Sequence, residues 1–175
     1  HSLIKALDTM PAGISVSLAA GVDETILAES LDQGMPAGIV SRPSNAGDDA
    51  ALSTLGVMLD GFYEWATDVL DMRVADYHGQ IKVVEDEAHL QDIYHRLYGI
   101  KSSDKSFYLH EEDTLYVAAP AFTKEVVGHE LGHMVVSNYF VVQPSAKAAE
   151  VLAGYIEFQL RKLIMAQGYA VDIEG

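Results

Sequence analysis

The chain has 175 residues, of which 49% are hydrophobic, so it can bury the core of one domain with room for a small appendage. Its formal net charge of −15 indicates a solvated acidic surface and argues against a nucleic-acid partner, which would need a basic face. The absence of cysteine excludes disulfides, thiolate metal ligands and cysteine nucleophiles. No apolar run is long enough to cross a bilayer, so we expect no membrane span.

The N-terminal part of the chain is rich in Gly, Ala and Ser and differs in composition from the rest. A short β-like run at 15–18 precedes an expected helix over 23–34, which starts at a capping aspartate and ends at a glycine. The stretch RPSNAGDD, residues 42–49, has the Pro, Asn, Gly and paired Asp of a linker. We therefore divide the chain into an N-terminal segment of unknown role, residues 1–43, and a folded domain over 50–175.

The elements after the linker alternate between helical and β-like patterns. Apolar residues at helical spacing predict a long amphipathic helix over 50–74, and a second helix over 86–100 follows the apolar strand 81–85. The stretch SFYLHEEDTLYVAAP predicts a hairpin of strands 106–110 and 114–118 around an acidic turn. Two more helices complete an α+β pattern.

The first of these two helices carries two histidines one turn apart, in TKEVVGHELGHMVVSN. Thr123 is the expected N-cap, and an apolar stripe supports the helix. On a helix His129 and His133 point the same way and can bind one zinc ion. Glu130 then stands beside the metal's water and can take its proton, which histidines acting as ligands cannot do. The alternative is a buried helix whose histidines form ordinary hydrogen bonds, and a third ligand decides between the two.

The second helix, expected over 144–168, supplies a candidate third ligand. One of its faces carries two carboxylates and two very small residues: Glu150, Ala153, Gly154 and Glu157. Small residues let two helices approach closely while a carboxylate reaches across. The facing helix has its own small pair, Gly128 and Gly132, beside the two histidines. This pairing favours a zinc site over a chance pair of histidines.

These two motifs resemble the gluzincin metallopeptidases. HELGH followed by EVLAGYIE is most similar to their aminopeptidase branch, whose glutamate helix reads E-G-F-A-x-Y-x-E. The resemblance covers residues 106–160 and implies a zincin-like fold, in which a small mixed sheet with an edge hairpin packs on the HExxH helix and the following glutamate helix. It implies one Zn²⁺ per chain on His129, His133 and Glu150, with Glu130 as general base. It also favours an exported location.

Two departures from the family shape the expected activity. The G-A-M-E-N type loop of the aminopeptidases is absent, and only a short stretch follows Glu150, which favours a minimal, single-domain endopeptidase. The chain is therefore predicted to hydrolyse a peptide or protein substrate. The alternative is a zinc-binding interaction domain that does not cut.

Several assignments within the site stay open at this point. Glu157 can act as the ligand instead of Glu150, or can orient a ligand histidine from outside the metal's shell. Candidates for the oxyanion donor are Tyr155, Tyr139 and His110. If the strand TLYVA, residues 114–118, is a sheet edge, a substrate peptide can pair with it as an added strand.

Overall fold

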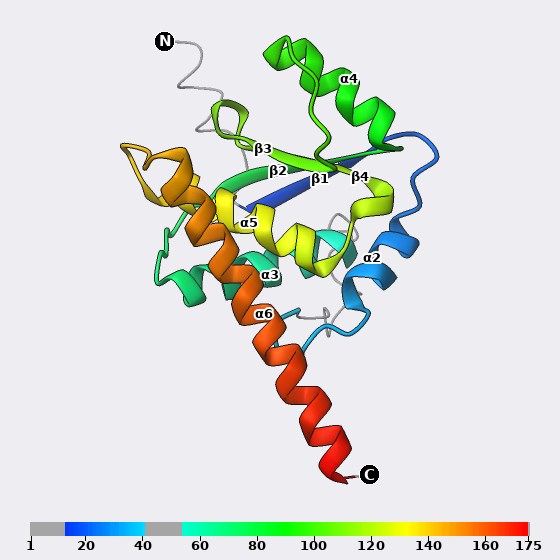
Figure 1. The fold of residues 1–175 in the computed structure, drawn as a ribbon, viewed down its shortest axis with the longest axis vertical. Helices are drawn as coiled ribbons and strands as arrows, with labels where there is room; N and C mark the ends of the chain where they lie inside the picture. The colour runs from blue at the N-terminus through cyan, green and yellow to red at the C-terminus, as the bar shows by residue number, and fades with distance from the viewer. Residues whose placement is uncertain (1–12, 41–53, 175) are drawn as a thin grey trace.

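The computed structural model describes residues 13–40 and 54–174 (Figure 1). The strands are β1 (Gly13–Leu18), β2 (His78–Val84), β3 (Ser106–Leu109) and β4 (Thr114–Ala118). The helices are α2 (Glu24–Asp32), α3 (Thr54–Leu70), α4 (Glu87–Tyr98), α5 (Lys124–Tyr139) and α6 (Ala146–Glu174). The α+β prediction is confirmed, while the predicted linker at 42–49 lies outside the described residues.

The strands form one mixed sheet in the order β1-β2-β4-β3. β1, β2 and β4 run parallel, and β3 pairs antiparallel with β4 as the predicted hairpin. TLYVA does not lie at a sheet edge, so the condition for pairing a substrate peptide with it is not met. This segment is β4, which pairs with β2 on one side and β3 on the other, and all five of its residues are buried. Continuous burial of a short strand is typical of an inner parallel strand. On this side of the sheet the edge is formed by β3.

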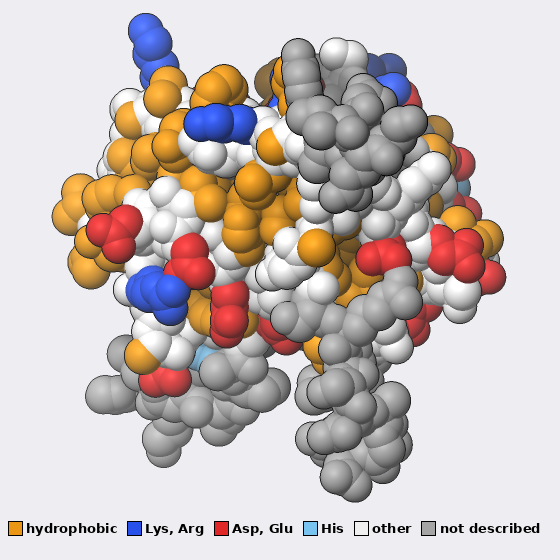
Figure 2. Space-filling model, turned by 90° about the horizontal axis from the view of Figure 1, so that it is seen from below, with side chains coloured by type: hydrophobic (Ala, Val, Ile, Leu, Met, Phe, Trp, Pro, Cys, Tyr) orange, Lys and Arg blue, Asp and Glu red, His pale blue; other side chains and the backbone are white. Residues whose placement is uncertain are grey.

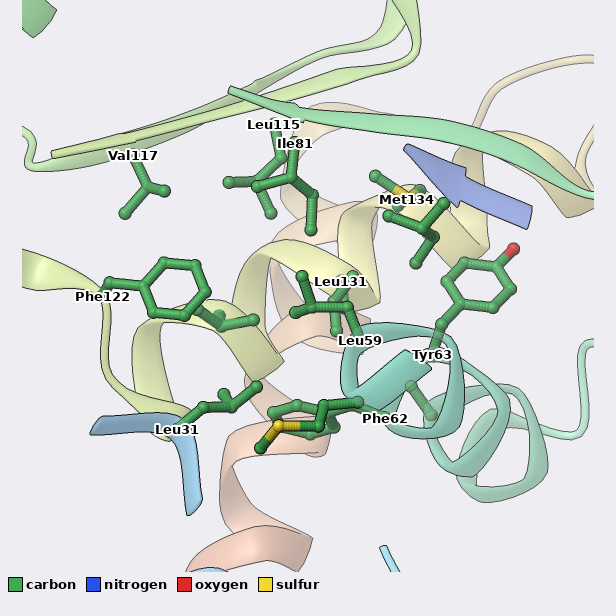
Figure 3. Close-up of a cluster of buried hydrophobic side chains, with 14 of the residues drawn as sticks. Leu31, Leu59, Phe62, Tyr63, Ile81, Leu115, Val117, Phe122, Leu131 and Met134 are labelled. Atoms are coloured by element: carbon green, nitrogen blue, oxygen red, sulfur yellow. The ribbon is translucent and has the colours of Figure 1, made fainter. Parts of the chain in front are cut away.

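The two faces of the sheet are covered unequally. α3 and α5 lie along one face together with α2 and α6, whereas α4 covers the opposite face (Figure 1). The larger core fills the space between the sheet and α3 and α5 (Figure 3). Its central side chains come from five elements: Leu31, Leu59, Phe62, Ile81, Leu115, Leu131 and Met134. β1 and α2, which belong to the predicted N-terminal segment, thus contribute to the same sheet and core as the rest of the chain.

Polar caps fix where several helices begin. The side chain of Thr123 accepts a hydrogen bond from the Val126 N–H and starts α5 as predicted. Ser145 accepts from the Ala148 N–H at the start of α6. The predicted end of α6 at Gly168 is wrong, because the helix continues to Glu174. A single glycine disfavours a helix by only about 1 kcal/mol relative to alanine, which is too little to end one.

The surface agrees with the acidic composition. On the face shown in Figure 2, acidic side chains stand at several separate places among hydrophobic ones. Within the described part of the chain, no helix combines the length and the apolar character that a membrane crossing requires.

Candidate metal centre

Close packing of α5 on α6 brings the two predicted motifs together. A Cβ atom added at Gly132 would lie 2.9 Å from the Cα of Ala153, so only glycine allows this approach of the two backbones. Gly128 instead faces α3, where an added Cβ would lie 2.9 Å from the ring of Phe62. Gly154 takes no part in the close approach, because nothing lies within 4 Å of a Cβ built there. The predicted small-residue contact is therefore real but involves Gly132 and Ala153.

Two histidine nitrogens converge on one carboxylate. His129 Nε2 lies 3.2 Å from Glu150 Oε2, and His133 Nε2 lies 2.8 Å from Glu150 Oε1. One donor atom from each of these three residues lies within 4.8 Å of the others, so the group could hold a metal ion. Burial lowers the pKa of His133 against the raising effect of Glu150, which favours the neutral imidazole that a metal binds.

The second nitrogen of His129 faces the other predicted carboxylate. His129 Nδ1 is buried and lies 2.6 Å from Glu157 Oε1, although it makes no hydrogen bond. Glu157 is also paired with Arg161, whose Nη2 lies 3.1 Å from Oε2. Glu157 thus stands behind the histidine ring, on the side away from Glu150.

Glu130 is the buried carboxylate of the site, with only 7% of its surface exposed. Its Oε1 accepts a hydrogen bond of 3.0 Å from the hydroxyl of Ser106 on β3. Burial raises its pKa to about 7, although the charge of His129 and the Ser106 hydrogen bond act in the opposite direction. The Glu130 carboxylate is therefore held in position by a residue of β3.

These residues line one pocket of about 600 Å³ between α5, the start of α6 and β3. His129, Glu130, His133 and Glu150 all contribute to its wall. The ring of Tyr108 on β3 lies nearly parallel to that of His133, at 7° and 6.5 Å between centroids. The metal-binding group is thus accessible to a ligand along the sheet edge.

The predicted oxyanion donors lie elsewhere. Tyr155 is 45% exposed on α6 and stacks on Phe158, and Tyr139 is 44% exposed at the end of α5 beside Phe140. His110 contacts the Ser137 hydroxyl. Of these three candidates, none belongs to the described residues that line the pocket.

Among the lining residues that sequence reasoning missed, Ser106 and Tyr108 contact the predicted site residues Glu130 and His133. Alternation along β3 contains the signal, because residues 106 and 108 share one face of the strand while Phe107 and Leu109 are buried on the other. Placing β3 at the edge beside α5 would have assigned both side chains to the site.

The donor set fits a divalent metal such as zinc, which binds neutral imidazole and carboxylate. Two Nε2 atoms directed at one carboxylate, with His129 Nδ1 facing the carboxylate of Glu157, are the expected surroundings of such an ion. No protein-family model, curated protein or solved structure matches this chain. The arrangement of the site's own residues is therefore the basis for a function.

Proposed function

We propose that this protein is a zinc-dependent peptidase in which His129, His133 and Glu150 hold the metal. One observation carries the proposal: both Nε2 atoms meet the Glu150 carboxylate in a pocket that also contains the buried carboxylate of Glu130. Metal-binding side chains alone indicate only a metal site. The additional, separately held carboxylate is what hydrolysis requires.

Two nitrogens and one oxygen form a ligand set that zinc takes in catalytic sites, where a fourth position stays open. When bound, zinc would polarise a carbonyl and lower the pKa of water, so that hydroxide is available near neutral pH to attack that carbonyl. Glu157 orients His129 by facing its Nδ1 at 2.6 Å, so that Nε2 is the nitrogen presented to the metal. Arg161 in turn fixes the carboxylate of Glu157.

Glu130 acts as the general base. Its carboxylate accepts the proton of the attacking water, and the acid formed then donates that proton to the nitrogen of the leaving amine. The hydrogen bond from Ser106 restrains one of its oxygens, which leaves the other available for the proton. Burial in the pocket keeps the carboxylate apart from bulk water.

The outer edge of β3, which pairs with no other described strand, positions the substrate. Ala118 N–H donates to Lys105 C=O, so the alternation of the antiparallel ladder directs the amides of Phe107 and Leu109 toward β4. The amides of Ser106 and Tyr108 then face outward, on the side of the pocket. An extended peptide that pairs with them would lie along the metal-binding group.

The test compares the parent with Glu130→Gln, Glu150→Ala and, as a matched control on α5, Glu125→Gln. We expect about one zinc per chain and cleavage of an unfolded protein by the parent and by Glu125→Gln. Glu130→Gln should retain zinc without cutting, and Glu150→Ala should lose zinc. Cleavage by Glu130→Gln at the parent rate, or full zinc in Glu150→Ala, would contradict the mechanism.

A zinc-binding interaction domain is the second candidate. It is favoured by the positions of Tyr139 and Tyr155, which lie outside the pocket and leave it without either predicted donor. One zinc per chain with no cleavage of any unfolded protein would select this function over the peptidase.

A further inference from the structure

The pocket extends past the metal-binding group to a wall of aromatic side chains. Its lining continues from the metal-binding residues, over β3, to Tyr94 and Tyr98 of α4 and Phe107 of β3. The ring of Tyr94 lies 4.6 Å from that of Tyr98 and 5.2 Å from that of Phe107. We call these three residues the aromatic wall. Because one pocket contains both the metal-binding residues and the aromatic wall, a ligand held at the metal can also contact the wall.

β3 separates the two regions of the pocket. Ser106 and Tyr108 point toward α5, where they meet Glu130 and His133. Phe107 points to the opposite side of the strand and packs under α4. An extended peptide beside β3 has the same alternation, so if one of its side chains faces the metal, its neighbours in sequence face the wall.

The wall is built from rings that are only partly used in packing. Phe107 is buried, but Tyr98 is 44% exposed and Tyr94 is half-buried, so their rings present apolar surface to the pocket. Ring-to-ring geometries here are tilted and edge-on, which are the arrangements a further aromatic ring can join.

We propose that the aromatic wall is a specificity subsite that selects peptides with an aromatic side chain next to the residue facing the metal. The inference rests on the proposed peptidase function for the identity of the ligand as a peptide. Acidic side chains are disfavoured at this position, because Asp104 lines the pocket and Lys105, which also lines it, is paired with Glu87 at 3.5 Å.

The first measurement is binding, with zinc-loaded Glu130→Gln so that no peptide is cut. The probes are fluorescently labelled octapeptides of Ala and Ser in which one position at a time carries Phe, Ala or Glu, followed by anisotropy. At one position we expect the Phe peptide to bind about tenfold or more tightly than the Ala peptide, because an aromatic ring is buried there. The Glu peptide should bind more weakly than the Ala peptide at the same position.

Variants locate the preference on the wall. Added to Glu130→Gln, Tyr98→Ala should reduce the Phe-to-Ala ratio below about threefold, and Tyr94→Ala should do the same. Tyr98 is exposed enough that its replacement leaves the fold intact, which thermal unfolding checks. Phe158→Ala is the control, since Phe158 is an exposed ring on α6 outside the pocket. A ratio near one at every position, or a ratio unchanged by both tyrosine variants, would overturn the subsite.

Cleavage by the parent separates this inference from the proposed function. Selective binding of the Phe peptide without cleavage of any peptide would support the subsite and refute the peptidase. Cleavage of the Phe, Ala and Glu peptides at equal kcat/KM would support the peptidase and overturn the subsite.

Discussion

The glycine at the contact of α5 and α6 allows a sharp test of the metal site. Replacing Gly132 by alanine adds one methyl group, which would lie 2.9 Å from the Cα of Ala153 and 3.2 Å from Cγ1 of Ile156. The first neighbour is backbone, so the two helices must move apart. Gly154→Ala is the matched control, since the same methyl group on α6 meets nothing within 4 Å.

The magnitude follows from comparing the two variants. Each replacement gains about 1 kcal/mol of helix propensity, and this gain cancels in the comparison. Gly132→Ala carries in addition an overpacking penalty of about 1–3 kcal/mol. The free energy of unfolding of Gly132→Ala should therefore lie about 1–3 kcal/mol below that of Gly154→Ala, with Gly154→Ala more stable than the parent.

Metal affinity provides the second readout. His129 and His133 lie on α5 and Glu150 lies on α6, so a wider spacing of the helices separates the ligands. We expect zinc affinity, measured by competition with a chromophoric chelator, to fall about tenfold or more in Gly132→Ala, as it does when ligand orientation is disturbed. Gly154→Ala should bind zinc as the parent does. Equal stability and equal zinc affinity in the two variants would refute this account of the helix contact.

Three further variants test separate features. Glu157→Gln should lower zinc affinity about 10- to 100-fold in chelator competition, yet still bind one zinc at saturation, because it orients His129 from behind. Burial raises the pKa of Asp60, so the folded state binds its proton more tightly than the unfolded chain and the stability contribution of Asp60 falls as pH rises above about 4. The free energy of unfolding of Asp60→Asn, taken relative to the parent and measured in urea, should therefore be higher at pH 7 than at pH 4. Thr123→Ala should cost about 1 kcal/mol of unfolding free energy in the same assay, and Thr123→Ser should restore most of it.

Opposite outcomes would be equally informative. Unchanged zinc affinity in Glu157→Gln would show that the Glu157 carboxylate has no role in metal binding. A stability difference between Asp60→Asn and the parent that does not change with pH would mean that the burial of this carboxyl has no effect on its titration. Full stability of Thr123→Ala would show that α5 needs no side-chain cap.

The group of His129, His133 and Glu150 could be predicted because its information is local. The spacing of His129 and His133 places both on one side of any helix, and the face of α6 that carries Glu150 is defined by its own small residues. Only the packing of α5 on α6 had to be inferred, and Gly132 and Ala153 indicated it. The hairpin of β3 and β4 was predictable for the same reason, since a short turn joins its strands.

The position of β4 in the sheet could not be inferred in this way. Whether TLYVA is an edge depends on its pairing with β2, which lies about 30 residues earlier in the chain, and no turn or spacing records that pairing. For the same reason, nothing in the sequence places Tyr108 or Tyr98 in one pocket with the two histidines, because that proximity depends on the order of the strands in the sheet.

The unequal covering of the sheet has a consequence for how the molecule opens. The face under α4 has a small core of its own, made of Leu90, Phe107, Leu109, Tyr116 and Ala118, and it is separate from the larger core that holds α3 and α5. Elements with few buried contacts open at lower free energy, so the amide hydrogens of α4 should exchange with solvent before those of α3 and α5. Each such opening would also dismantle the aromatic wall. A peptide bound there should slow exchange in α4 more than in α3, so exchange in this helix would report occupancy of the pocket.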